Sequence, residues 1–86
     1  MFYLIEYNRR AGRLVTFKTF AESERLKADE LRFAIELDLH RKKIDHEVVL
    51  LQAESEAALR RTHGRYFYDL RQMLELIQRT IERRIP

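Results

Sequence analysis

The sequence predicts an α+β domain with the element order β-β-α-β-α. Three observations predict it: residues 1–20 follow the two-residue period of strands, a long charged segment then follows the helical period, and a short apolar run interrupts a second helical stretch. All 86 residues fit one domain, with a three-stranded sheet packed by helices. A chain this short buries only about 60 to 65 per cent of its unfolded surface, so the stability margin is narrow.

Residues 1–20 are predicted to form a β-hairpin. A loop that contains Asn8 and Gly12, two residue types that accept positive φ, joins two apolar segments. In the first strand both faces carry apolar side chains, because the alternation places aromatic or aliphatic residues on each side. The tip of the hairpin then presents three basic side chains, Arg9, Arg10 and Arg13.

A helix is predicted from about Phe20 to Arg41. Thr19 and Glu22 match a capping box, in which each side chain accepts a hydrogen bond from the backbone N–H of the other residue. The basic trio at residues 41–43 complements the partial negative charge at the C-terminus of the helix. Both ends of the helix therefore carry recognisable sequence signals.

The helical period places apolar residues in two stripes on nearly opposite sides of this helix. The first stripe is Ala28, Leu31, Ile35 and Leu39, and the second is Leu26, Phe33 and Leu37. A surface helix needs one apolar face to pack on its domain. The second stripe is therefore expected to meet either the last helix of the chain or a second copy of the protein.

Residues 46–52 are predicted to form the third strand. Four consecutive aliphatic residues, 48–51, indicate burial on both faces. A right-handed helical crossover lays this strand parallel to the second strand. The simplest sheet then places the first strand between the other two.

The segment from Ser55, a predicted N-cap, to about Arg84 keeps the helical period. Two interpretations stay open. In one, Gly64 ends a short helix and Asp69 with Gln72 caps a second helix; in the other, a single helix about 45 Å long runs through the whole segment. Either interpretation gives an aliphatic stripe of Leu70, Leu74, Ile77 and Ile81.

The predicted core draws on every element. Its members are Leu4, Ile5, Val15, Phe17, Leu31, Ile35, Val49, Leu51, Leu59, Leu70, Leu74 and Ile77. The two-sided helix and the C-terminal stripe together carry more apolar surface than one small copy can cover. We therefore predict a homodimer whose self-association uses Leu26, Phe33, Leu37, Leu70, Leu74, Ile77 and Ile81.

The composition is that of an ordinary soluble protein. Charged residues make up 36% of the chain and the formal net charge is only +3. No cysteine is present, which removes disulfides, thiolate metal sites and cysteine nucleophiles. The longest aliphatic run is far too short to span a bilayer, and no signal peptide is recognisable. We expect a cytoplasmic protein without membrane contact.

No motif names a reaction. The best place for chemistry is a polar cluster where the long helix ends and the third strand begins: Asp38, His40, Asp45, His46 and Glu47. These residues match no metal-binding or catalytic spacing, and two glycines in the chain cannot form a phosphate loop. We therefore assign no catalytic residue, metal ligand or cofactor, and place a small metal-dependent hydrolase or nuclease third among the candidate functions.

As the first candidate function, we predict a non-catalytic interaction or regulatory protein that acts through its surface. The expected partners are a second copy of the chain and another protein. Nucleic-acid binding is the alternative, because arginines gather at the hairpin tip and in the C-terminal half, near aromatic residues able to stack on bases. Acidic residues on the long helix interrupt this basic field. The candidate residues are Arg9, Arg10, Arg13, Arg60, Arg61 and Arg65.

Overall fold

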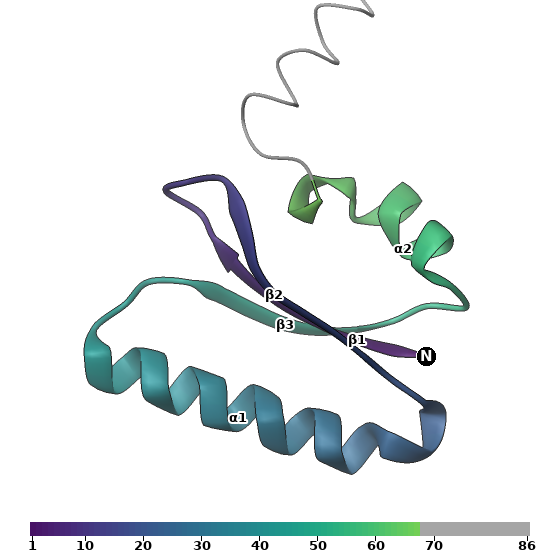
Figure 1. Ribbon diagram of the computed structural model, residues 1–86, viewed down its shortest axis with the longest axis horizontal. Coiled ribbons are helices and arrows are strands. Elements are labelled where there is room, and N and C mark those ends of the chain that lie inside the picture. Colours follow the sequence, from purple (N-terminus) through teal and green to yellow (C-terminus); the bar gives the residue numbers. More distant parts are fainter. Residues whose placement is uncertain (68–86) are drawn as a thin grey trace, which may run out of the picture.

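A computed structural model of the chain describes residues 1–67 (Figure 1). The elements are β1 (Phe2–Asn8), β2 (Arg13–Phe20), α1 (Arg25–Lys42), β3 (Glu47–Gln52) and α2 (Glu56–Thr62), with 3₁₀ turns at Glu22–Glu24 and Gly64–Tyr66. This order confirms the predicted α+β class and the sequence β-β-α-β-α. The predictions for Leu70, Leu74, Ile77 and Ile81, and for a second C-terminal helix, lie outside the described residues.

The sheet has the strand order β2-β1-β3, and β1 pairs antiparallel with both neighbours. β2 and β3 consequently run parallel, as the right-handed crossover predicted. The central strand is also the most buried element, since each residue from Phe2 to Tyr7 is buried. Its two neighbours each leave one edge without a partner strand within residues 1–67.

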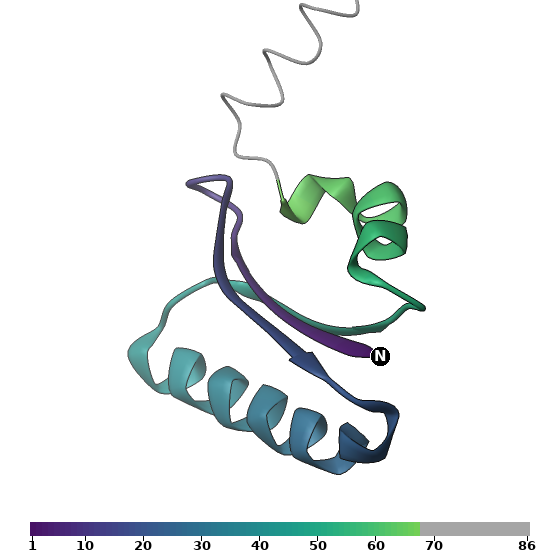
Figure 2. The ribbon, with the colours of Figure 1, turned by 45° about the vertical axis from the view of Figure 1, so that its right-hand side comes forward.

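The molecule has three layers, with α1 on one face of the sheet and α2 on the other (Figures 1 and 2). On the α2 side the core joins Leu59 and Tyr66 to alternate residues of β1, namely Tyr3, Ile5 and Tyr7. On the α1 side Leu4 of β1 is buried, as are Ala28 and Leu39 of the helix. Burial of both faces of β1 explains why its sequence is apolar almost throughout.

The predicted start of α1 is wrong. Thr19 lies in β2 and pairs with Tyr3, so it caps no helix. The helix begins only at Arg25, after a turn in which the Glu24 carboxylate accepts from the Ala21 N–H at 2.9 Å. The ladder with β1 keeps β2 extended to its last residue, and this pairing overrides the local capping signal.

The C-terminus of α1 closes with a Schellman motif. Lys43 adopts the left-handed conformation, with φ of 56°, and its N–H donates to the carbonyl of His40. The Ile44 N–H donates to the carbonyl of Leu39 at 2.9 Å. These two bonds satisfy carbonyls at the helix end and turn the chain toward β3.

Val15 is exposed, although the sequence predicts it in the core. The register shifts within the hairpin: Glu6 pairs with Thr16 but Tyr7 pairs with Leu14, so Val15 is the extra residue of a β-bulge. Its exposed fraction is 51%. The other described members of the predicted core divide into fully buried residues (Leu4, Ile5 and Leu59) and partly buried ones (Phe17, Leu31, Ile35, Val49 and Leu51).

α2 is short, so the interpretation of a single helix from Ser55 to Arg84 is wrong. The Ser55 side chain accepts from the Ala58 N–H at 3.1 Å, which confirms the predicted N-cap. The helix ends at Thr62, and Gly64 starts a 3₁₀ turn. This turn brings the Tyr66 side chain back onto the sheet, where it is buried.

Candidate interaction surfaces

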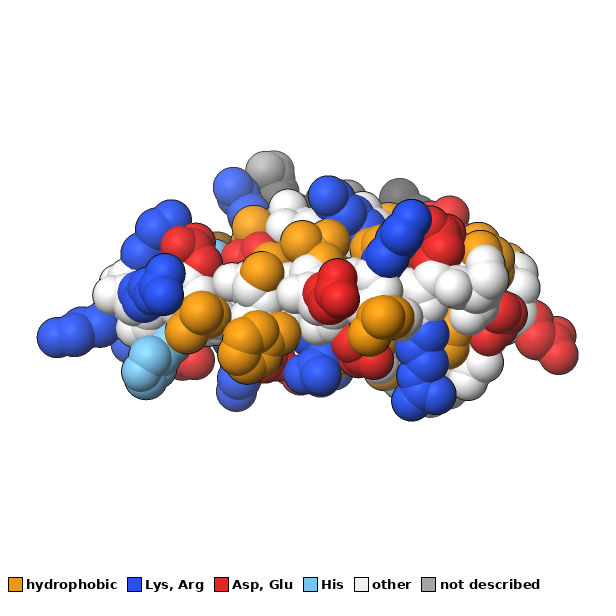
Figure 3. Space-filling view, turned by 90° about the horizontal axis from the view of Figure 1, so that it is seen from below, with side chains coloured by type: hydrophobic (Ala, Val, Ile, Leu, Met, Phe, Trp, Pro, Cys, Tyr) orange, Lys and Arg blue, Asp and Glu red, His pale blue; other side chains and the backbone are white. Residues whose placement is uncertain are grey.

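The outward side of α1 carries the second apolar stripe of the sequence, which we name the outer apolar face: Leu26, Phe33 and Leu37. Their exposed fractions are 71%, 64% and 39%, whereas Ala28 of the first stripe has none. Figure 3 views this side of the molecule and shows apolar side chains spread along α1 between charged ones. The prediction of a helix with two apolar faces is confirmed, and the described residues cover one of them.

A row of alternating charges runs along one side of α1, between its packed face and the outer apolar face. We name it the charged flank: Arg25, Asp29, Arg32 and Glu36. Asp29 lies 4.0 Å from the Arg25 side chain and 3.6 Å from the Arg32 side chain, and Arg32 also contacts Glu36 at 3.3 Å. Exposed pairs of this kind contribute little to stability individually. Their importance lies in the charge pattern that they present.

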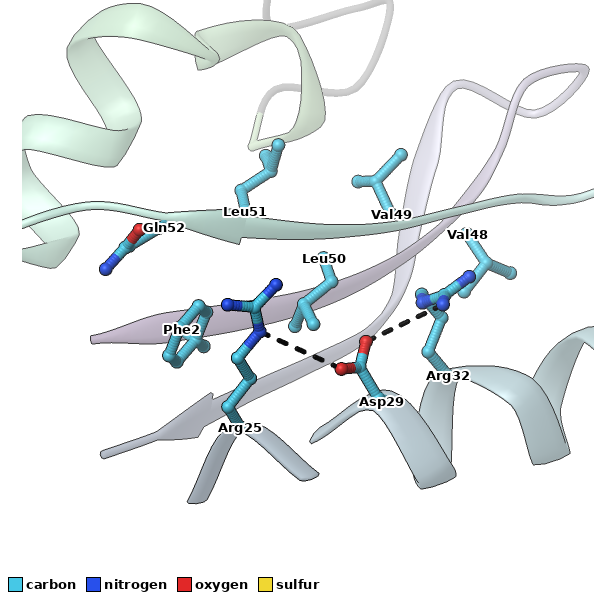
Figure 4. A pocket seen from close by; sticks show the side chains of 9 residues that line it. All are labelled: Phe2, Arg25, Asp29, Arg32, Val48, Val49, Leu50, Leu51 and Gln52. Carbon is cyan, nitrogen blue, oxygen red and sulfur yellow. Dashed lines mark ion pairs between the residues drawn. The ribbon is translucent and has the colours of Figure 1, made fainter. Parts of the chain in front are cut away.

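The charged flank borders a groove of about 530 Å³ between α1 and β3 (Figure 4). β3 forms the opposite wall, where the side chains of Val48 and Leu50 point toward α1 while those of Val49 and Leu51 point toward the core on the α2 side, and Phe2 contributes at one end. Arg25 lies toward the Gln52 end of β3, whereas Arg32 lies toward the Val48 end. The groove thus combines an apolar strand with a charged helix side.

A buried carboxylate lies at the centre of the sheet. Glu6 of β1 is only 8% exposed, and each of its oxygens has a partner. Thr16 donates to Oε1 at 2.9 Å, and the His46 Nδ1 lies 2.7 Å from Oε2. An ionised carboxylate only accepts, so the imidazole Nδ1–H is the donor. These contacts link Glu6 of β1 to Thr16 of β2 and to His46, the residue before β3, and use both oxygens of Glu6.

The polar cluster of the sequence is divided among separate contacts. His46 binds Glu6, Asp38 pairs with Lys42 at 3.0 Å, and Glu47 pairs with Arg65 at 2.9 Å. Across residues 1–67 no three His, Asp or Glu side chains gather closely enough to hold a metal ion. Two of these contacts, those of His46 and Glu47, link different elements, whereas the Asp38–Lys42 pair lies within α1.

Glu47 fastens the turn after α2 to the sheet. Arg65 donates to both carboxylate oxygens, at 3.2 and 2.9 Å, and the Tyr66 hydroxyl donates to Oε1 at 3.0 Å. The Arg65 hydrogen bonds lower the pKa of Glu47 most; burial opposes them, and the Tyr66 hydrogen bond adds a smaller lowering. Burial and the bond to Glu47 raise the pKa of Tyr66. Near neutral pH the Glu47 carboxylate is therefore ionised and the Tyr66 hydroxyl keeps its proton, so all three hydrogen bonds to Glu47 form.

We expect Glu47→Gln to lower the free energy of unfolding by about 1 kcal/mol at pH 7, because a charge-assisted contact becomes a neutral one. The pKa of Glu47 is lower in the folded state than in the unfolded state, where it is about 4.3. The contribution of Glu47 to stability is therefore complete above the unfolded-state pKa and is lost as the pH falls through the folded-state pKa. Urea unfolding at pH 7 and pH 3 should show the wild-type and variant stabilities converging in acid. Glu56→Gln is the matched control: its pair with Arg60 is half exposed, so both pH values should give differences within about 0.5 kcal/mol.

The six arginines proposed for nucleic-acid binding come from three parts of the chain: the hairpin, α2 and the turn after α2. Arg65 is held by Glu47, and Arg60 pairs with Glu56 while stacking over the Phe67 ring at 4.3 Å. Arg61 is exposed on α2, and the hairpin arginines Arg9, Arg10 and Arg13 are exposed on another element. Arg10 and Lys43 border one cavity of about 540 Å³, which also contains Asp45. Nucleic-acid binding by these six side chains stays a prediction, and two of them, Arg60 and Arg65, are each paired with a carboxylate.

Comparison with protein-family models, with curated proteins and with solved structures finds no match to this chain. None of the helices within residues 1–67 combines the length and the apolar character that crossing a membrane requires.

Two parts of these surfaces were not predicted from the sequence. Glu6 is a lone charge in an otherwise apolar strand, which is a usable signal for a buried polar contact, but its partner His46 is forty residues away. The charged flank was visible as alternating charges at helical spacing. The position of the charged flank beside β3 depends on how α1 packs on the sheet, and local sequence patterns do not predict this packing.

Proposed function

We propose that this chain is a non-catalytic interaction protein that acts through its surface as a homodimer and presents the outer apolar face to a protein partner. The observation that carries the proposal is the exposure of Leu26 and Phe33 on a helix whose other side is already packed. Removing a large apolar side chain from water is worth about 1.5–3 kcal/mol. A partner that covers the outer apolar face gains this free energy for each of the large apolar side chains that it removes from water.

The spacing of the outer apolar face also fits a protein partner. Leu26, Phe33 and Leu37 are seven and four residues apart, which is the pattern of anchor residues that a helix places in a groove of another protein. Charged residues border the stripe on the same helix, as at the rim of an interface. The small domain size favours the homodimer, because association widens a narrow stability margin.

Two measurements test the proposal. Size-exclusion chromatography with light scattering should give about 21 kDa, twice the chain mass of 10.5 kDa, at micromolar concentrations. A photoreactive phenylalanine analogue at position 33 should form discrete covalent adducts in cells, because Phe33 is 64% exposed and lies within the proposed contact. The matched control carries the same analogue at Lys27, on another side of α1. A monomeric mass at all concentrations, or adducts equally abundant at both positions, contradicts the proposal.

A further inference from the structure

In the part of the chain that the structure describes, the two outer strands of the sheet, β2 and β3, differ in how well their edges are protected from pairing. β2 carries a bulge at Val15 and the charged residues Arg13 and Lys18, which are devices that keep an edge strand from pairing with other chains. β3 pairs with β1 over six residues without a register shift, and its residues from Val48 to Leu51 are all aliphatic. An aliphatic edge without a bulge is suited to receive another strand.

The charged flank above this edge is self-complementary. Along α1 the four charges alternate plus, minus, plus, minus. When a second α1 runs in the opposite direction, Arg25 of one copy lies opposite Glu36 of the other, and Asp29 lies opposite Arg32. A second copy of α1 lying antiparallel to the first therefore meets opposite charges at all four positions. A peptide of a single charge would meet repulsion at two of them.

The symmetry centres of the helix and of the strand coincide. The centre of the charged flank lies between Asp29 and Arg32, and this part of α1 faces the middle of β3 across the groove, near Val49 and Leu50 (Figure 4). One two-fold axis perpendicular to the sheet can pass close to both centres. Such an axis keeps both copies of α1 on the same face, since rotation about it reverses strand direction without turning the sheet over.

We propose that two copies of this chain join β3 to β3 in antiparallel orientation, with the axis at Val49 or Leu50, and form a continuous six-stranded sheet. The two charged flanks then face each other, with Arg25 of each copy beside Glu36 of the other. This inference rests on the proposed homodimer, and it places the interface at β3 and the charged flank instead of at the predicted self-association residues Leu26, Phe33 and Leu37. The outer apolar faces remain open on the same side of the dimer, where they form one larger surface for a partner.

Charge reversal in the flank tests this interface. Arg25→Glu and Glu36→Arg should each raise the dissociation constant of the dimer about fivefold, because each places like charges opposite each other twice. A mixture of the two variants should return to within about twofold of the wild-type value, since every Arg25–Glu36 contact is opposite in charge in the heterodimer. Residues 25 and 36 are about 16 Å apart along one helix, so no contact within a chain explains this rescue.

Sedimentation equilibrium measures the dissociation constants, and circular dichroism checks that each variant is folded. Lys18→Glu, on the β2 edge, is the matched control and should leave the dimer unchanged. A wild-type dimer that neither variant weakens, or that the mixture fails to restore, overturns the β3 interface while the proposed homodimer stands. A wild-type monomer at all concentrations overturns both.

Discussion

Leu59→Ala is expected to lower the free energy of unfolding by about 2–5 kcal/mol, as large-to-small substitutions in a packed core do. Leu59 is fully buried and is the residue by which α2 contacts the core cluster of Tyr3, Ile5 and Tyr7. Shortening it removes apolar contact and leaves a cavity between α2 and the sheet. The total stability expected for 86 residues is about 4–13 kcal/mol, so the loss is a large part of it.

Urea unfolding followed by circular dichroism measures this loss. Leu26→Ala is the matched control, because it is the same substitution at a residue that is 71% exposed. Its effect should stay within about 0.5 kcal/mol. Equal losses in the two variants would show that Leu59 is not part of the core described above.

His46→Ala is expected to cost about 3 kcal/mol of unfolding free energy. The substitution leaves the Glu6 Oε2 without its partner at 2.7 Å, inside a sheet where the Glu6 side chain is 11% exposed. Losing one member of a buried pair leaves an uncompensated charge, which is a larger penalty than the worth of the pair itself. Thr16 still binds the other oxygen, which limits the loss.

A double-mutant cycle isolates this contact. In a Glu6→Gln background, His46→Ala should cost less than in the wild type, with a coupling of about 0.5–3 kcal/mol. His40→Ala supplies the matched control, since His40 is exposed on α1 and should change stability by no more than about 0.5 kcal/mol. Additive effects of the Glu6 and His46 substitutions would contradict a direct contact between them.

Much of the fold follows from periodicity and handedness in the sequence. The hairpin and the order of the strands were predicted correctly, because alternating side chains define the strands and a right-handed crossover allows few arrangements. The two apolar stripes of α1 were also predicted, since Leu26 and Ala28 fall on different sides of any regular helix. These features depend on short-range geometry that the order of the residues contains.

The remaining features depend on pairing between distant segments. The exposure of Val15 follows from a bulge that exists only in the ladder with β1, and Thr19 stays extended because it pairs with Tyr3. The contact of Glu6 with His46 likewise joins distant segments, since it links β1 to the residue before β3. A local sequence pattern can fit two conformations of the same segment. Pairing with another strand decides between them, and the local pattern does not contain that information.

The bulge at Val15 has a consequence for the size of any assembly. If β3 edges join in pairs, the edges left on the sheet that residues 1–67 form are two copies of β2, each interrupted by an unpaired residue and bearing charge. Further strands would have to add to a twisted, positively charged border. In that proposed dimer we expect growth of the sheet to stop at two chains, because the bulge and the charges of β2 disfavour the pairing of a further strand.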